Sequence, residues 1–568
     1  MFINKVLKRQ KAGYKFYFLV MILMLLPLML TGCDTMEILR QYEIEIAITS
    51  MDEGDIDQLQ VKVGDRSVED FAYEGGVAKA DIGDLRGSNE IKPVLAENDE
   101  QDFYPESVTV GAADDGETIN FNAVQEINVF ENLQVKIDEA YPGDILILDN
   151  ADFERAEIST PGLILKSSYD IDETDPEGYT YVAGLEINEN DVTVEEINVS
   201  PGSSVEINDC NNIQLINNRI TGNNNLTGIQ INNSEVFLED NTIRDKSTGI
   251  VAEAGSELYL RNEIIRDNRK TGLKLSESSA EVHDSEFRDN EQGFDLAGGS
   301  DMYLVESELG YQERGIYIHE SSLEVLETDF YRNDTAVVSE DASGFELRHS
   351  RIDNSSDTGI KVTGGSVKIS HTDLISNGQA MNLNEADSIE ISDSTINNNT
   401  SGLNLDGASR DIQLLYNDIS YNNNYGIKLQ NISGELKGNK ITNNRNGIIH
   451  RQGGSLQVEN NDIADNRFNG LEVESASAEV IFNNIIYNDY DGGRFIGEKS
   501  IKESRVNENN IIDNGTGLYA SWNYAQDVEE LNAEKNWWGN ENVEMIENMT
   551  HGPVRYEPIL EEEQEVGP

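Results

Sequence analysis

Two segments of the sequence decide its fold. Asn417–Ile427 reads Asn-Asp-Ile-Ser-Tyr-Asn-Asn-Asn-Tyr-Gly-Ile, and Asn439–Ile448 reads Asn-Lys-Ile-Thr-Asn-Asn-Arg-Asn-Gly-Ile. In each, an Asn precedes an Ile by two positions, a second Asn follows that Ile by three, and Gly-Ile ends the segment. The second segment begins 22 residues after the first. A fixed period of this length indicates a solenoid, in which each repeat is one supersecondary unit.

The same marks recur over some 290 residues of the chain. Their mean spacing is roughly 22 residues, within the solenoid range. Ala336-Val337 and Ala380-Met381 fill two gaps with the next smallest residue, and Gly493 marks a degenerate repeat. A glycine followed by a large apolar residue stands at Gly228, Gly249, Gly272, Gly293, Gly315, Gly359, Gly402, Gly426, Gly447, Gly470 and Gly517.

The chemistry of the repeat predicts three short strands per coil. The apolar runs are too short and too rich in β-branched residues for helices, and the spacing of a leucine-rich repeat is absent. Coils that stack at ~4.8 Å place equivalent residues in columns, with Ile, Val and Leu facing inward as a continuous core. Asn at the turns tolerates the left-handed conformation, and its amide can bond to the Asn of the next coil as a ladder. Gly or Ala marks places without room for a larger side chain.

This Asn-x-Ile and Gly-Ile repeat resembles the right-handed, single-stranded parallel β-helix of the pectin-lyase-like superfamily. The flanks agree: Glu131–Ala140 can form a cap helix with Phe130, Leu133 and Ile137 on one face, followed by Tyr141-Pro142-Gly143-Asp144 and a strand. Near the end, Asn536-Trp537-Trp538-Gly539 and Gly552–Leu560 resemble the closing segment of secreted members, including the NosD-like group. The resemblance covers residues 126–560 and implies an all-β fold, while function varies widely within the superfamily.

The first 32 residues are predicted to be a bacterial lipoprotein signal peptide. Five basic residues precede the apolar run Phe16–Leu30, which ends in Leu30-Thr31-Gly32-Cys33. This resembles the lipobox, whose cysteine becomes the acylated N-terminus of the mature protein. Cys33 would then anchor the protein to the cell membrane by its acyl chains, such as palmitate, facing the extracytoplasmic side, with the leaflet and envelope type left open. Residues 33–41 would be a tether.

A small β-sandwich is expected between the tether and the repeats, over residues 42–124. Residues 43–48 and 59–63 alternate polar and apolar side chains, and Gly-rich pairs mark turns. Residues 103–123 resemble the closing strands of carboxypeptidase-regulatory-like modules, which usually act as spacers or adhesive units. At the other end, residues 561–568 form an acidic tail.

Composition excludes several classes of protein. The chain of 568 residues carries 106 Asp and Glu against 42 Lys and Arg, a formal net charge of -64. Such a charge repels nucleic acid, and it disfavours acidic polymers unless cations bridge them. Two cysteines cannot form a disulfide framework, and Cys210 is expected to be a small buried residue. The six histidines are scattered through the sequence without a metal-binding spacing, which weakens a copper function of the NosD-like kind.

The residue between the two apolar positions that follow each Gly mark should point outward from one sheet. Lys274, Lys361 and Lys428 fall in this column, several coils apart, and are interpreted as isolated surface lysines. Between the last two, a polar strip suits sugar hydroxyls. The candidate glycan-contact face therefore consists of Lys361, Asn382, Asn384, Asn404, Asp406 and Lys428.

A calcium site is a weaker expectation. Residues 170–177 form an acidic insertion whose candidate ligands are Asp170, Asp172 and Asp175. The segment fails the EF-hand pattern at its third ligand and glycine positions, and a solvated acidic loop is the simpler interpretation. No other cofactor is implied.

The leading hypothesis is a membrane-anchored extracytoplasmic β-helix lipoprotein that binds polymeric carbohydrate at the cell surface. The alternative is a polysaccharide lyase or glycoside hydrolase acting in the outer groove of the β-helix. A third possibility is an adhesion or assembly scaffold. Acidic residues are so abundant that pairs of carboxylates identify no catalytic site, so the sequence leaves enzymatic activity open.

Overall fold

The structure is a computed structural model that describes most of the chain after residue 41. The described residues are 42–49, 59–63, 66–69, 71–74, 77–85, 89–95, 103–105, 108–110, 118–169, 180–407, 412–522 and 529–566. Cys33 and the candidate calcium ligands Asp170, Asp172 and Asp175 lie outside them. Within the described part of the chain, no helix has the length and apolar character to cross a membrane.

The N-terminal unit is a small sandwich of two sheets. One has the strand order β4-β5-β1-β9-β7 and the other β3-β2-β6-β8. Most pairs are antiparallel, but β1 and β9 run parallel, from Glu45↔Thr118 to Thr49↔Asn122. The strands are β1 Tyr42–Thr49, β2 Leu59–Val63, β3 Arg66–Val68, β4 Ala72–Glu74, β5 Val77–Leu85, β6 Asn89–Leu95, β7 Phe103–Tyr104, β8 Val108–Val110 and β9 Thr118–Ala123.

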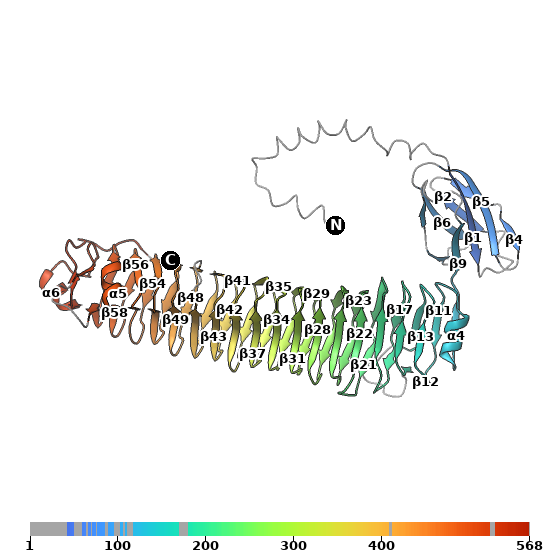
Figure 1. The fold of residues 1–568 in the computed structure, drawn as a ribbon, viewed down its shortest axis with the longest axis horizontal. Helices are drawn as coiled ribbons and strands as arrows, with labels where there is room; N and C mark the ends of the chain where they lie inside the picture. The colour runs from blue at the N-terminus through green and yellow to red at the C-terminus, as the bar shows by residue number, and fades with distance from the viewer. Residues whose placement is uncertain are drawn as a thin grey trace. The chain divides into compact units, whose positions relative to one another are not determined.

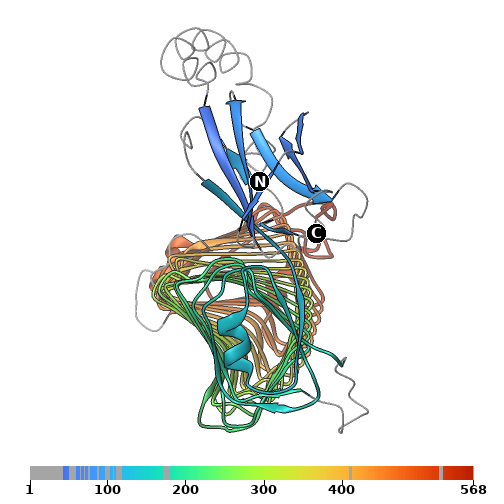
Figure 2. The same cartoon turned by 90° about the vertical axis from the view of Figure 1, so that its right-hand side faces the viewer.

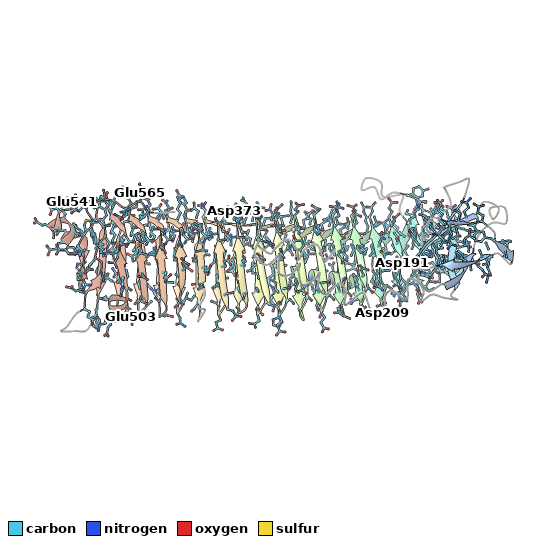
Figure 3. The ribbon with its side chains drawn as sticks, turned by 90° about the horizontal axis from the view of Figure 1, so that it is seen from above. Asp191, Asp209, Asp373, Glu503, Glu541 and Glu565 are labelled. Carbon is cyan, nitrogen blue, oxygen red and sulfur yellow. The ribbon has the colours of Figure 1, made fainter. Side chains whose placement is uncertain are left out.

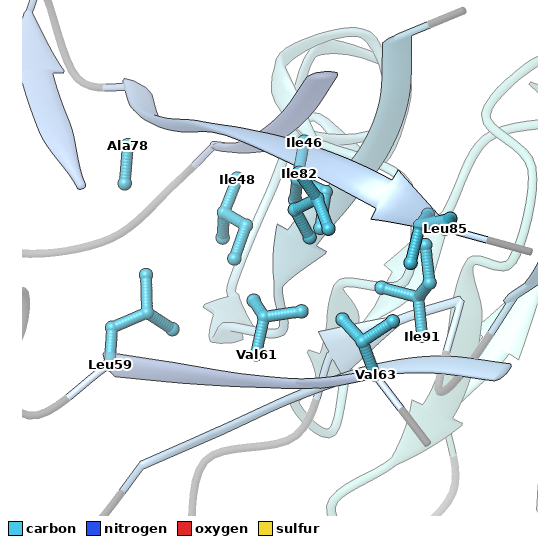
Figure 4. Packing of buried hydrophobic residues seen from close by; sticks show 9 residues of the cluster. All are labelled: Ile46, Ile48, Leu59, Val61, Val63, Ala78, Ile82, Leu85 and Ile91. Carbon is cyan, nitrogen blue, oxygen red and sulfur yellow. The ribbon is translucent and has the colours of Figure 1, made fainter. Parts of the chain in front are cut away.

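Alternation along these strands builds the core of the sandwich (Figure 4). In β2, Leu59, Val61 and Val63 are buried while Lys62 between them is exposed. They pack on Ile46 and Ile48 of the opposite sheet. Period-2 alternation is the pattern that lets each sheet bury one face.

The repeats form a right-handed parallel β-helix with three sheets (Figure 1). The first sheet has 20 strands from β10 (Glu126–Val129) to β64 (Val554–Arg555), and the second has 17 from β12 (Asp152–Phe153) to β60 (Asn510–Ile512). Strand numbers rise by three from neighbour to neighbour over most of each sheet, so each coil gives one strand to each sheet. Viewed along their axis, successive coils superimpose (Figure 2).

The third sheet has 18 strands and positions the candidate site. Its strands are six residues long through most of the β-helix. They are β13 Ala156–Ile158, β16 Leu185–Ile187, β19 Val205–Asn208, β22 Thr227–Asn232, β25 Thr248–Glu253, β28 Thr271–Ser276, β31 Gln292–Ala297, β34 Arg314–His319, β37 Thr335–Glu340, β40 Thr358–Thr363, β43 Gln379–Asn384, β46 Ser401–Asp406, β49 Tyr425–Gln430, β52 Asn446–Arg451, β55 Leu471–Glu474, β58 Asp491–Ile496, β61 Thr516–Ser521 and β63 Thr550–His551.

Each of these turns uses one residue for the left-handed conformation and the next residue for the ladder of hydrogen bonds. A single Asn was expected to do both. Asn443 adopts φ 58°, and its neighbour Asn444 carries the ladder. Asn422 Nδ2 donates to Asn444 Oδ1 at 2.9 Å, and Asn444 N donates to Asn466 Oδ1 at 3.0 Å. The ladder side chains are buried, because the residue after the left-handed one points into the core. One residue of the turn therefore adopts the left-handed backbone conformation, and the residue after it forms the amide ladder.

The Gly marks are places of close backbone approach, as expected. A Cβ on Gly228 would stand 2.6 Å from Gly249 O, at a φ that is not positive. The cost of a larger side chain there is therefore steric. The degenerate mark was expected at Gly493 but lies one residue earlier, at Gly492, which stands next to Gly470 on the neighbouring coil. Gly493 instead pairs with Leu471 and occupies the position of the large apolar residue.

The helices are short and few in the described part of the β-helix: α4 (Leu133–Glu139), α5 (Glu498–Glu503) and α6 (Val543–Met549). The predicted cap helix begins later than expected. Leu133 and Ile137 are buried as predicted, but Phe130 precedes the helix and is 66% exposed. In the C-terminal cap, Trp538 is buried and packs edge-on against Tyr556, as a plug for the end of the core.

The tail is held against the second sheet up to residue 566. Gln564 N donates to Asn510 Oδ1, and Asn510 Nδ2 donates to Gln564 O, both at 2.9 Å. Asn484 Nδ2 donates to Val566 O at 3.2 Å. These side chains belong to adjacent strands, so the last described residues run along the sheet.

Acidic side chains are spread along the β-helix from Asp191 to Glu565 (Figure 3).

Candidate functional site on the third sheet

A single column of outward-facing residues runs along the middle of the third sheet. In β43 the pattern iBBiBi places Asn382 outward between the buried Met381 and Leu383. Register connects each member to the next, and it adds Arg494, which the sequence analysis missed because of the shifted glycine. From β13 to β63 the column reads Glu157, Glu186, Glu206, Gln230, Val251, Lys274, Asp295, Tyr317, Val338, Lys361, Asn382, Asn404, Lys428, Ile449, Glu472, Arg494, Tyr519 and His551.

The structure brings the six predicted glycan-contact residues together. Lys361, Asn382, Asn404 and Lys428 are direct neighbours on four successive strands, and Asn404 Nδ2 donates to Asn382 Oδ1 at 2.9 Å. In the next column, Asn384 pairs with Asp406, whose carboxylate accepts a bond from Gln430. We call these six residues the polar patch. It offers amide, carboxylate and ammonium groups over four coils, with no ion pair to either lysine among the described residues.

Further polar groups border the polar patch where the strands begin. Asn424 Nδ2 donates to Ser401 Oγ at 3.0 Å, and Gln379 Nε2 lies 3.5 Å from the Tyr425 hydroxyl. Burial raises the pKa of Tyr425, while its bonds to Ser401 and Gln379 oppose the rise. The phenol therefore stays a neutral donor at neutral pH. No sequence motif marks these residues, so their proximity follows only from the way the coils are paired.

Lys274 is not the isolated lysine that the sequence predicted. It is the neighbour of Asp295 in the outward column, and Asp295 is followed by Tyr317. Burial raises the pKa of Asp295, against the opposing charges of Lys274 and Arg314. The guanidinium carbon of Arg314 lies 5.2 Å from the ring centre of Tyr317. Neither cation forms an ion pair within the described part of the chain.

The tyrosine of this cluster is tied to a glutamate. Tyr317 hydroxyl donates to Glu340 Oε2 at 2.7 Å. That hydrogen bond is the main cause that raises the pKa of Tyr317 to about 12, with burial second. We call Lys274, Asp295, Arg314, Tyr317 and Glu340 the charged cluster. It combines two cations, two carboxyl groups and a phenol on four successive coils, and only its lysine was singled out from the sequence.

Five exposed aromatic side chains lie along one edge of this sheet, spread from the coil of β34 to the coil of β58. Tyr311, Tyr421 and Tyr487 follow second-sheet strands β33 (Glu308–Gly310), β48 (Asp418–Ser420) and β57 (Asn484–Ile486), each with positive φ. Phe468 and Tyr490 lie in the same turn, between the second and third sheets. These five residues, which we call the aromatic edge, are 41–57% exposed. Of the described large aromatics that are this exposed between residues 180 and 530, only Tyr416 lies on another turn.

The aromatic edge is ordered by stacking. The rings of Phe468 and Tyr490 lie 5.5 Å apart and nearly parallel, and the guanidinium of Arg445 lies 4.9 Å from the Phe468 ring centre. Farther along, Arg332 donates to the Tyr311 hydroxyl at 3.0 Å. Phe468 and Tyr490 thus form one continuous apolar surface, whereas Tyr311 and Tyr421 stand singly on other coils.

A second charged group near the C-terminal end is fully paired. Arg451 bonds to Glu472, and Asn469 Nδ2 donates to the other oxygen of Glu472 at 2.9 Å. Arg494 binds the buried Asp491 at 2.9 Å, and its guanidinium carbon lies 4.2 Å from the Tyr519 ring centre. Since each charge has a partner, this group fits a structural role better than a reactive one.

No group of three or more His, Cys, Asp or Glu stands ready to hold a metal ion in the described part of the chain. One sequence-based expectation is corrected: His349 and His371 are not scattered but stack with ring centres 4.7 Å apart. Cys210 is buried as expected, and burial raises its thiol pKa to about 11.

Comparison with known families agrees with this architecture. The family described as "Right handed beta helix region" matches residues 181–309, 314–453 and 382–532. These ranges cover more than half of the chain, so the protein belongs to the right-handed β-helix family. No curated protein matches it.

Solved structures resemble the chain only distantly. A mutant of the periplasmic alginate epimerase AlgG is 12% identical, with a TM-score of 0.26, over 60% of this chain and 86% of that one. A mutant of the PL6 family alginate lyase AlyGC is 9% identical, with a TM-score of 0.20, over 77% and 100%. The catalytic unit of a GH87 alpha-1,3-glucanase from Streptomyces thermodiastaticus is 10% identical, with a TM-score of 0.21, over 92% and 88%. Scores this low carry no argument about activity.

Proposed function

We propose that this protein is a lipid-anchored, extracytoplasmic β-helix protein that binds polymeric carbohydrate along its third sheet. The observation that supports the proposal is that the aromatic edge and the polar patch follow the same sheet: Tyr421 precedes the strand of Lys428, and Phe468 and Tyr490 precede β55 and β58, two and three coils farther along. A sugar ring has apolar C–H faces and a rim of hydroxyls. An aromatic edge can pack against the faces while amides and carboxylates bond to the hydroxyls.

The repeat suits a polymer better than a small molecule. Outward positions recur at each coil, ~4.8 Å apart, so a chain laid along the axis meets side chains at successive positions, such as Asn382 and Asn404 on neighbouring strands. Individually weak contacts then add through multivalency. A neutral or cation-bridged polymer is expected, because the chain carries a formal net charge of -64.

The test is a glycan array followed by titration with the best polymer. The paired variants Asn382→Ala with Asn404→Ala, and Phe468→Ala with Tyr490→Ala, should each weaken binding at least ~10-fold, about 1.4 kcal/mol. Gln413→Ala with Gln457→Ala, outward residues of the first sheet, is the matched control and should bind as the parent does. Equal loss in all three variants would contradict binding at the third sheet, and a blank array would favour an adhesion or assembly scaffold.

A second candidate function is a polysaccharide lyase or glycoside hydrolase, favoured by the charged cluster. Removal of a proton beside a carboxylate needs a base and a cation that neutralises the developing charge. Lys274, Arg314 and Tyr317 offer such groups. Incubation with uronate polysaccharides, with and without calcium, should produce the absorbance of unsaturated product if a lyase acts here. Loss of that product in Arg314→Gln would support the assignment, and absence of product from every polymer would reject the lyase.

Membrane attachment is a separate part of the proposal and rests on the lipobox ending at Cys33. Cells fed an alkyne-bearing palmitate should label the parent chain, while Cys33→Ser should remain unlabelled and leave the membrane fraction. Labelling of the serine variant would contradict acylation at this residue.

A further inference from the structure

The turn between the first and second sheets places two histidines, flanked on each side by a carboxylate, in one row. Glu327, His349, His371 and Asp393 occupy the same position on successive coils, with φ between 50° and 51°. The backbone bonds Glu327 N to Arg348 O, His349 N to Ser370 O and His371 N to Ser392 O link these turns. All four side chains are exposed. The row lies at a different turn from the aromatic edge.

The two central members form a pair. The imidazole rings of His349 and His371 have centres 4.7 Å apart and planes 27° apart. Their separation in the sequence is 22 residues, one coil, which is why the ladder makes them direct neighbours. We propose that His349 and His371 form a two-histidine site for a divalent transition-metal ion such as Zn²⁺ or Cu²⁺.

The geometry suits two nitrogen ligands. A bound ion lies about 2.0–2.1 Å from each imidazole nitrogen. Nearly parallel rings 4.7 Å apart need only rotate about their side-chain bonds to turn one nitrogen each toward a shared ion. Water would fill the remaining positions, since no third ligand stands ready among the described residues. The flanking carboxylates of Glu327 and Asp393 add negative charge that favours a cation.

The backbone under the pair is held in place. His349 precedes the buried ladder residue Ser350, whose hydroxyl accepts from Thr328 N at 3.1 Å. His371 precedes Thr372, whose amide donates to Ser394 Oγ at 3.1 Å. Because the ladder fixes both turns before binding, little conformational entropy remains to be lost there on coordination. The unfolded chain lacks this arrangement, so the ion should stabilise the folded coils.

The pair also selects among cations by ligand type. Imidazole suits zinc, copper and nickel, whereas calcium and magnesium prefer oxygen. Excess Ca²⁺ should therefore leave the site empty.

The test uses the full chain, with Zn²⁺ for calorimetry and Cu²⁺ as a spectroscopic probe. We expect one tight site above the weak background of ions held by surface carboxylates, and a Cu²⁺ paramagnetic resonance spectrum with two nitrogen couplings. The thermal midpoint should rise more with Zn²⁺ than with the same concentration of Ca²⁺. His349→Asn and His371→Asn are the informative variants, because Asn tolerates positive φ and preserves the turn. Each should weaken binding at least ~10-fold, about 1.4 kcal/mol, and leave one nitrogen coupling.

His319→Asn is the matched control, since His319 is a half-buried histidine on the third sheet, away from this row. It should bind Zn²⁺ and Cu²⁺ as the parent does. Unchanged affinity in the His349→Asn, His371→Asn double variant would overturn the proposal, as would a single nitrogen coupling in the parent. Metal-free thermal midpoints of all variants distinguish lost ligands from lost folding.

Discussion

Glu263 occupies a place in the buried ladder where its neighbours are amides or hydroxyls. Its Oε1 accepts two hydrogen bonds from Asn241, one from N at 3.1 Å and one from Nδ2 at 2.8 Å. Every other member of this ladder, from Asn218 to Asn536, is Asn, Ser or Thr. Burial raises the pKa of the Glu263 carboxyl to about 8, against the opposing bonds from Asn241. The side chain is therefore held as a neutral acid at neutral pH.

Glu263→Gln is expected to stabilise the protein above pH 5. The unfolded chain releases this proton above its usual pKa near 4.5, while the folded chain holds it until about 8, so the folded state loses stability as pH rises between these values. The loss reaches up to about 5 kcal/mol, and Gln removes it while keeping the acceptor. Urea midpoints measured from pH 4.5 to 8.5 should fall less steeply in Glu263→Gln. An unchanged slope would show that the carboxyl is ionised in the fold.

His450 has the opposite dependence on pH. It lies in the inward column of the third sheet, between Leu429 and Val473, and burial lowers its pKa to about 4. The unfolded chain takes up a proton below about 6.5, while the folded chain resists until about 4, so stability is lost as pH falls through this window. His450→Leu should remove up to about 3 kcal/mol of this loss. Thermal midpoints at pH 4.5 and 7.5 measure it, and an equal acid-induced drop in parent and variant would count against it.

Adding a methyl group should destabilise the protein at a Gly mark but not at a glycine with open space around it. Gly228→Ala places a methyl group against Gly249 O and the Ile243 side chain, and should cost about 1–3 kcal/mol. Gly344→Ala is the matched control, because a Cβ there meets nothing within 4 Å and its φ is not positive. Chemical unfolding of both variants tests the contrast. Equal destabilisation would mean that glycine at the marks serves another purpose.

The charged cluster predicts how salt affects an anionic ligand. If a uronate polymer binds at Lys274 and Arg314, affinity should fall with added salt, and the variant Lys274→Gln with Arg314→Gln should show weaker binding and a flatter salt dependence. The variant Lys361→Gln with Lys428→Gln separates this cluster from the polar patch. Titrations at 20 and 200 mM salt measure this dependence. If the affinity of the variant Lys274→Gln with Arg314→Gln falls with salt as steeply as that of the parent, the charged cluster is not the anion site.

The repeat made the fold predictable from the sequence, because residues one period apart stack on one another in neighbouring coils. The marks at Gly426 and Gly447 and the ladder residues Asn422 and Asn444 needed only one spacing rule. Local packing did not follow from that rule. Phe130 matched the amphipathic pattern of a cap helix, yet it precedes the helix and faces solvent.

The candidate sites were harder to predict, because they combine neighbouring coils. Tyr317 shares the outward column with Lys274 and Asp295, but its partners Arg314 and Glu340 stand in other columns, and the repeat rule does not bring them together. The pair His349 and His371 was recoverable from the sequence, since their separation equals the period. A metal motif read along the chain joins residues a few positions apart, whereas these two histidines meet only because the coils stack.

The parallel coils have an electrostatic consequence for the whole β-helix. Residues 126–568 carry about 50 of the net negative charges. The 20 strands of the first sheet span nineteen steps, on the order of 90 Å at ~4.8 Å each. One net charge then falls at roughly every 1.7 Å of axis, close to the linear charge density of double-stranded DNA. The folded repeat is thus a rigid polyelectrolyte, expected to gather a condensed atmosphere of cations, and any partner that displaces those ions gains affinity from their release.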